Sequence, residues 1–256
     1  MAEPITVSGV ELEVDQRGSG QPLLFLHCGE EPGRDRLWLD LLARKFNVIA
    51  PSHPGFGKSA LPEWIGTVDD IAYLYLDLVG QLELKDALLV GVGFGGWIAA
   101  EMAVRNTNAF SKLVLASPLG IKVSDRDSRD IADIHSMPQA QFIELAWANP
   151  ANGHIAYDQM SDAELTALVR GREALALFGW KPYMHSPRLK NWLHRIDKPT
   201  LLLWGDQDGI VTPAYGKAWA ELIPDSRMEI IPACGHFPMW ERPQEFADKI
   251  VAFSGS

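Results

Sequence analysis

Short runs of hydrophobic residues recur along the chain, and polar or amphipathic segments separate them. All of these runs predict strands, and the continuous run at 22–26 predicts a strand covered on both faces of a sheet. The runs lie at 22–26, 46–50, 87–91, 112–116, 200–204 and 227–231. Apolar residues between several of these runs repeat at helical spacing. Strands that alternate with helices predict a mostly parallel sheet flanked by helices.

The remaining regular elements follow from weaker patterns. Residues 5–15 alternate between apolar and polar positions, which predicts an N-terminal hairpin with a half-exposed face. A helix is expected from Thr67 onward, because two aspartates follow this residue in the first turn. Other helices are expected at 35–45, after the glycine cluster near residue 93, at about 213–222 and after Pro243.

The alternation of strands and helices stops between residues 121 and 196, where we find no core strand. Charged segments at 124–127 and 161–164 indicate helix starts. We interpret 121–196 as a helical lid inserted into a core domain that comprises 1–120 and 197–256. The lid segment is rich in large aromatic residues: Phe142, Trp147, Tyr157, Phe178, Trp180, Tyr183 and Trp192.

Composition narrows the possible partners and setting. The 256 residues are 47% hydrophobic and 22% charged, as in an ordinary globular protein. The net charge of −10 argues against nucleic acid or an anionic membrane surface as a partner. No apolar run approaches the ~18 residues of a membrane span, and the N-terminus lacks the features of a signal peptide. Two cysteines make no disulfide framework. We expect a cytoplasmic monomer or homodimer with a small-molecule substrate.

A cluster of small residues follows the run at 87–91, with the sequence Gly91-Val92-Gly93-Phe94-Gly95. This segment resembles the nucleophile elbow of the α/β-hydrolase family, in which the pattern is Gly-x-Ser-x-Gly. The nucleophile position of the pattern is occupied here by Gly93. The resemblance implies an α/β-hydrolase fold.

Other motifs extend the resemblance over nearly the whole chain. His27-Cys28-Gly29 stands where the family has its oxyanion loop, and Gly55-x-Gly57-x-Ser59 resembles a further glycine turn of the family. Asp208 lies in a loop similar to the family's acid loop, and Gly235-His236 matches its histidine loop. The order of elbow, acid and histidine is also that of the family.

The resemblance implies a role for each of these residues. Asp208 would fix the tautomer of His236, which would act as a general base above Gly93. The backbone N–H of Phe94 and an N–H near Cys28 or Gly29 would stabilise an oxyanion. Asp206 lies two residues from Asp208 and could be confused with it.

Other candidate residues have weaker support. We take His27, Ser117, Trp147 and Trp180 as candidate pocket residues, although a strand-ending role for Ser117 and lid packing for the tryptophans compete. Cys28 is close enough to the site to suggest a thiol nucleophile, but a small loop filler is the simpler interpretation. The other histidines, among them His53, are expected at the surface or in the lid, with His53 near the pocket side.

No cofactor is expected. The histidines lack the spacing of metal ligands. The glycines at 91, 93, 95 and 96 depart from the Gly-x-Gly-x-x-Gly spacing of a dinucleotide site.

The glycine at position 93 leaves three explanations open. A serine has been replaced in an ordinary serine hydrolase, or the chain naturally uses His236 and Asp208 without a serine, as lyase and cofactor-independent oxygenase types do, or it is a non-catalytic binder. The intact acid and histidine loops count against a binder, because folding requires neither. We therefore expect a hydrolase that acts on a small, largely apolar ester, lactone or diketone-like carbonyl compound.

Overall fold

The structure is a computed structural model that describes residues 3–29 and 34–255. Eight strands form one sheet in the order β1-β2-β4-β3-β5-β6-β7-β8. Within the described ranges, the pairs β1–β2 and β2–β4 are antiparallel and the pairs from β4 to β8 are parallel. The strands are β1 (Glu3–Val7), β2 (Val10–Arg17), β3 (Gln21–Leu26), β4 (Phe46–Pro51), β5 (Ala87–Val92), β6 (Phe110–Ala116), β7 (Thr200–Gly205) and β8 (Ser226–Ile231). Every strand expected from an apolar run is confirmed, as is the N-terminal hairpin.

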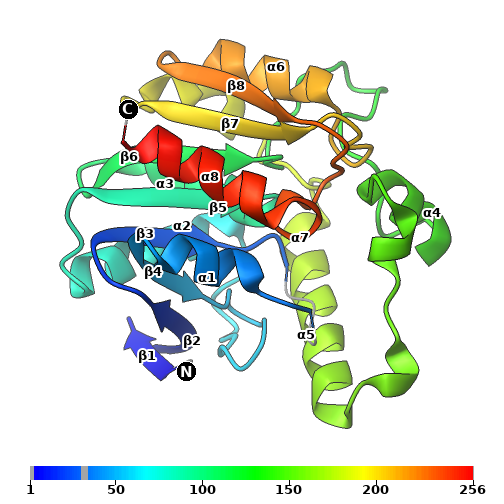
Figure 1. Cartoon of the computed structure of the whole chain (residues 1–256), viewed down its shortest axis with the longest axis horizontal. Helices are drawn as coiled ribbons and strands as arrows, with labels where there is room; N and C mark the ends of the chain where they lie inside the picture. Colours follow the sequence, from blue (N-terminus) through cyan, green and yellow to red (C-terminus); the bar gives the residue numbers. More distant parts are fainter. Residues whose placement is uncertain (1–2, 30–33, 256) are drawn as a thin grey trace.

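Helices cover both faces of the sheet. They are α1 (Leu37–Ala43), α2 (Val68–Gln81), α3 (Phe94–Arg105), α4 (Gln139–Ala146), α5 (Asp162–Gly179), α6 (Pro213–Leu222), α7 (Pro238–Glu241) and α8 (Pro243–Ser254). Helices α1 and α8 lie on one face, and α2, α3 and α6 lie on the other (Figure 1). The structure is an α/β-hydrolase fold, as expected.

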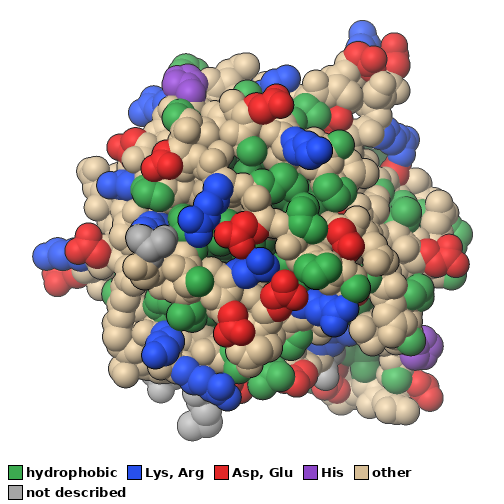
Figure 2. All heavy atoms as spheres, turned by 45° about the horizontal axis from the view of Figure 1, so that its top comes forward, with side chains coloured by type: hydrophobic (Ala, Val, Ile, Leu, Met, Phe, Trp, Pro, Cys, Tyr) green, Lys and Arg blue, Asp and Glu red, His purple; other side chains and the backbone are tan. Residues whose placement is uncertain are grey.

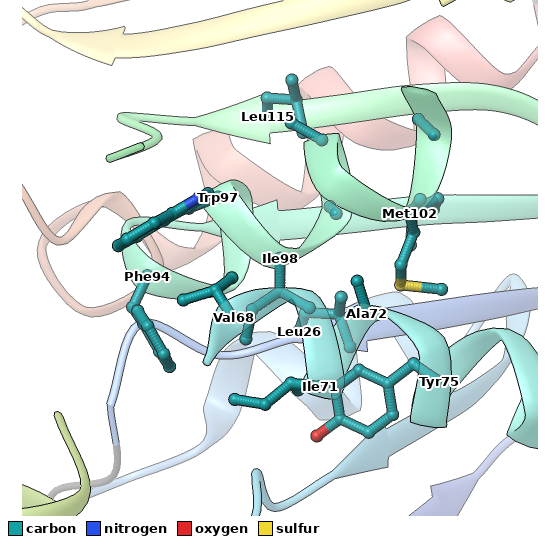
Figure 3. Close-up of a cluster of buried hydrophobic side chains, with 14 of the residues drawn as sticks. Leu26, Val68, Ile71, Ala72, Tyr75, Phe94, Trp97, Ile98, Met102 and Leu115 are labelled. Carbon is teal, nitrogen blue, oxygen red and sulfur yellow. The ribbon is translucent and has the colours of Figure 1, made fainter. Parts of the chain in front are cut away.

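Alternating side chains of the strands feed the two hydrophobic layers. In β3, Leu24 and Leu26 pack with α2 and α3, whereas Leu23 and Phe25 face α1 and α8. This division explains why the run is apolar throughout, because each face of the strand is buried under helices. Figure 3 shows the first layer, in which Ile71 and Tyr75 of α2 meet Ile98 of α3.

A capping box defines the start of α2. The Thr67 hydroxyl accepts a hydrogen bond from the Asp70 N–H at 3.2 Å, and the Asp70 carboxylate accepts one from the Thr67 N–H at 2.9 Å. These two bonds satisfy donors that a helix N-terminus otherwise leaves without partners.

Replacing Thr67 with alanine is expected to lower the free energy of unfolding by about 1 kcal/mol, because the cap is lost. Urea denaturation followed by circular dichroism measures this change. Thr166→Ala is the control, since Thr166 is an exposed residue inside α5 where alanine is the better helix former. Equal stability of the Thr67→Ala and unsubstituted chains would contradict the assignment.

Residues 121–196 connect β6 to β7 and contain α4 and α5. These helices lie beyond the carboxyl ends of the parallel strands (Figure 1). The helix expected at 161–164 is confirmed, because Ser161 caps α5. The helix start expected at 124–127 is wrong: the Asp130 carboxylate accepts the N–H groups of Val123 and Ser124 and holds a loop there. Such side-chain bonds to the backbone compete with helix formation.

The surface gives little sign of a charged docking site on the face drawn in Figure 2. Basic and acidic side chains are interspersed there and do not gather into a patch of one sign. Within the described ranges, no helix is both long and apolar enough to cross a membrane.

Candidate active site

The turn between β5 and α3 brings backbone segments unusually close together. A Cβ atom on Gly95 would lie 2.1 Å from the Leu26 carbonyl oxygen, and one on Gly91 would lie 2.4 Å from the Gly95 carbonyl oxygen. Gly93 itself has φ +52° and ψ −113°, a region that side chains strongly disfavour. Gly91 and Gly95 are therefore required for this sharp strand-to-helix turn, which places residue 93 at the carboxyl edge of the sheet.

His236 faces the position that a side chain on residue 93 would occupy. A Cβ atom built on Gly93 would lie 3.2 Å from His236 Nε2 and 3.0 Å from Cys28 Cβ. The loop after β8 thus brings His236 to the elbow, and the loop after β3 brings Cys28 there from the other side.

Asp208, in the loop after β7, holds the His236 ring. Its Oδ2 lies 2.9 Å from His236 Nδ1, and both residues are buried. Its Oδ1 accepts the N–H groups of Ile210 and Val211, each at 3.0 Å. A carboxylate can only accept, so Nδ1 of His236 carries the proton and Nε2 presents its lone pair toward residue 93.

Asp206 is positioned for a different purpose. Its Oδ1 accepts the Cys234 N–H at 3.2 Å and so connects the acid loop to the histidine loop. The contact to the imidazole comes from Asp208, the acid that the sequence analysis selected.

The end of α4 is tied to both of these loops. The Ala146 carbonyl accepts the His236 N–H at 2.8 Å, and the Leu145 carbonyl accepts the Gly209 N–H at 2.9 Å. The Glu241 carboxylate adds a bridge, because it accepts the N–H groups of Gly235 at 2.7 Å and Ala148 at 2.8 Å. The inserted segment therefore contributes directly to the placement of the imidazole.

Two backbone N–H groups near residue 93 are candidates for an oxyanion site. Neither the Phe94 N–H nor the Cys28 N–H donates to another residue in the ranges that the structure describes. The Phe94 N–H begins α3, where the helix dipole favours negative charge. Gly29, the third expected contributor, lines the same cavity as Cys28 and Phe94.

A cavity of about 310 Å³ is lined by Phe94 and by Cys28 and His236, the two residues next to the Cβ position of Gly93. Most of its wall is apolar or aromatic, and Arg172, His135 and Gln139 are exposed polar residues on its lining. The apolar part is formed chiefly by Phe56, Phe94, Phe142, Leu168, Met184 and Phe237. Such a space suits a small, largely apolar molecule.

None of the four candidate pocket residues lines this cavity. His27 lies under the loop, where its Nε2 accepts the His53 N–H at 3.0 Å. Ser117 is fully buried at the end of β6. Trp147 is buried against Phe237, with 5.0 Å between ring centroids.

Trp180 is the clearest correction, because its side chain is 64% exposed and borders a separate hollow beside Tyr183. Phe237 and Trp240 supply cavity wall that the sequence analysis missed. The available signal is that both residues lie within four positions of His236.

Cys28 lines the cavity but is not an activated thiol. Burial raises the pKa of Cys28 to about 12, so the group stays protonated at neutral pH. In the described part of the chain, no group of three or more His, Cys, Asp or Glu side chains is placed to hold a metal ion.

The fold is that of the α/β hydrolases. The sequence profile of the alpha/beta hydrolase family matches residues 23–249, and the chain belongs to this family.

Two relatives are similar over nearly the whole chain. The 2-hydroxy-6-oxo-6-(2'-aminophenyl)hexa-2,4-dienoic acid hydrolase of Metapseudomonas resinovorans is 28% identical, over 97% of this chain and 89% of its own length. The 2-hydroxymuconate semialdehyde hydrolase of Pseudomonas sp. strain CF600 is 25% identical, over 97% and 92%. Among solved structures, a serine hydrolase involved in carbazole degradation superposes with a TM-score of 0.82 at 25% identity, over 100% of this chain and 98% of its own.

Proposed function

We propose that this protein hydrolyses a small, largely apolar carbonyl compound and uses water, in place of a serine hydroxyl, as the nucleophile. The observation that carries the proposal is the 3.2 Å between His236 Nε2 and the Cβ position of Gly93. A base at this place points at the volume that the nucleophile of a serine hydrolase occupies, and glycine leaves that volume to a water molecule.

The chemistry needs three parts that the chain itself supplies. His236 Nε2 takes a proton from the water as the water oxygen bonds to the carbonyl carbon, and Asp208 stabilises the imidazolium. The N–H groups of Phe94 and Cys28 stabilise the oxyanion of the tetrahedral intermediate. When the intermediate collapses, the bond to the leaving group breaks, and His236 returns the proton to that group. The products are a carboxylic acid and the protonated leaving group.

The substrate class is an ester, a lactone or a diketone-like compound whose carbon–carbon bond is cleaved. The apolar cavity of about 310 Å³ supports a compound of modest size. The two relatives are named as hydrolases of a hexadienoic acid and of a muconate semialdehyde, which supports a small carbonyl compound as the substrate.

The missing nucleophile also favours a second candidate, a protein that binds such a compound without converting it. One experiment separates the two. A short activated ester and a 1,3-diketone are offered to the protein, turnover is followed, and quenched samples are weighed by intact-protein mass spectrometry.

We expect product formation with no acyl adduct on the chain at any time, because water attacks directly. An adduct that maps to Cys28 would replace water by the thiol as nucleophile. Saturable binding of both compounds with no product would favour the binder and overturn the hydrolase.

A further inference from the structure

A buried pair, His53 and Tyr75, lies directly beneath the candidate oxyanion site. His53 follows β4 and is fully buried, which corrects its expected place at the surface or in the lid. Its Nδ1 is 2.7 Å from the Tyr75 hydroxyl on α2, and its Nε2 is 2.8 Å from the His27 carbonyl oxygen. The pair therefore connects the helix layer behind the sheet to the loop that carries Cys28.

The hydrogen bonds fix the direction of each donor. A carbonyl oxygen can only accept, so His53 Nε2 carries the proton and donates to His27. The other ring nitrogen, Nδ1, is then left for the Tyr75 hydroxyl at 2.7 Å. The His53 backbone N–H donates to His27 Nε2 at 3.0 Å, and the two rings stack with centroids 3.8 Å apart. Burial lowers the pKa of His27 to about 3, so the His27 ring is neutral at neutral pH.

The bond to the His27 carbonyl sets the orientation of the next N–H. The His27–Cys28 peptide is trans, so its C=O and its N–H point in opposite directions. With the carbonyl held toward buried His53, the Cys28 N–H is directed to the other side. Cys28 also lines the cavity in which a substrate would bind.

His53 also contacts the residue that bears the second N–H. Its ring packs edge-on against the ring of Phe94, with centroids 5.6 Å apart. The His27 carbonyl lies against the start of α3, since a Cβ atom on Gly95 would be 2.5 Å from its oxygen. Figure 3 shows Tyr75 and Phe94 as members of one buried cluster. The His53 ring thus contacts both the His27 carbonyl, which precedes the Cys28 N–H, and the side chain of Phe94, which bears the other N–H.

We propose that His53, held by Tyr75, is a positioning residue that aims the Cys28 N–H at the substrate oxyanion. The proposal rests on the proposed function, because it assigns an oxyanion site to this hydrolysis. The pair touches neither substrate nor the reacting water and acts through the His27–Cys28 peptide.

The test compares two substitutions of similar length at His53. In His53→Gln the side-chain amide can still donate to the His27 carbonyl, whereas in His53→Met no donor remains. Tyr75→Phe removes only the hydroxyl, and Tyr73→Phe is its control, because Tyr73 is an exposed residue on the same helix.

We expect His53→Met to lower kcat about 10- to 100-fold with KM changed less than about threefold, since removal of a whole oxyanion donor costs about 10²–10³ in kcat. His53→Gln should recover most of the loss. Tyr75→Phe should lower kcat several-fold and Tyr73→Phe should leave it unchanged. Equal kcat for the Gln and Met variants, or a loss that appears in KM instead, would overturn the proposal. Should both His53 variants fail to fold, the comparison of Tyr75→Phe with Tyr73→Phe decides.

A second readout separates this proposal from the proposed function. The same variants are made in a Gly93→Ser background, and the rate of covalent labelling at position 93 by a serine-directed phosphonate is measured. If the unsubstituted chain has no turnover but labelling slows in His53→Met and recovers in His53→Gln, the water mechanism fails and the positioning role stands. If native turnover is present but His53→Met changes neither the turnover rate nor the labelling rate, the positioning role is wrong and the water mechanism stands. Absence of both turnover and labelling overturns both.

Discussion

The Gly93→Ser variant is expected to gain rapid hydrolysis of a short activated ester and to react covalently at position 93 with a serine-directed phosphonate. The new Cβ lies 3.2 Å from His236 Nε2, so the hydroxyl one bond further on lies within reach of the base. The Phe94 N–H is in place for the oxyanion. The unsubstituted chain should take no label at residue 93.

The substitution also carries a structural penalty that can be measured. Position 93 has φ +52°, and the added Cβ would be 3.0 Å from Cys28 Cβ. We expect the free energy of unfolding to fall by about 1–3 kcal/mol, because an L-residue is strained in this conformation. Gly93→Ala is the matched control, since it introduces the same Cβ and the same strain but no hydroxyl.

Intact-protein mass spectrometry and peptide mapping identify the labelled residue. A folded Gly93→Ser variant that stays inert to both ester and phosphonate would count strongly against the hydrolase. Labelling at Cys28 in the unsubstituted chain, with loss of turnover, would make the thiol the nucleophile instead.

Asp208→Asn is expected to lower kcat of the native reaction by about 10³–10⁴ with little change in KM. The introduced amide has the size of the carboxylate, and its oxygen can still accept the N–H groups of Ile210 and Val211. Its NH₂ group then donates to His236 Nδ1, which forces the ring proton onto Nε2. The base therefore loses the lone pair that faces residue 93.

Asp206→Asn is the control, because the Asp206 carboxylate accepts the Cys234 N–H in the same loop and an amide oxygen can do the same. Steady-state kinetics on one ester should show kcat within a few-fold of the unsubstituted chain for this variant. Similar kinetics for the two variants would mean that the His236–Asp208 contact has no part in turnover.

Much of the fold can be predicted from local pattern alone. The run Pro22–Leu26 is apolar at every position because helices cover both faces of β3. This pattern can be recognised in the sequence of the strand itself, without knowledge of the neighbouring strands. The start of α2 at Thr67 can also be predicted locally, because its capping partner Asp70 is only three residues away. The places of Asp208 and His236 follow from loops at the carboxyl ends of adjacent strands, which a parallel sheet brings to one edge.

The rest depends on contacts between distant segments. His53 is polar and lies in a loop rich in glycine and proline, so nothing local indicates that Tyr75 and His27 enclose it. Trp147 and Trp180 belong to the same aromatic-rich segment, yet one packs on Phe237 and the other faces solvent. The direction of each side chain is decided by how α4 and α5 dock, which their periodicity does not specify.

The attachment of α4 restricts how a substrate can enter. Leu145, Ala146 and Ala148 are bonded to the acid loop, the histidine loop and Glu241. Movement of this end of α4 would strain the backbone bonds that hold both loops. An entrance that leaves these bonds intact is expected beside α5, where Leu168 and Arg172 line the cavity. Slow amide hydrogen exchange at Gly209 and His236, together with faster exchange in α5, would indicate that local opening occurs on the α5 side of the cavity.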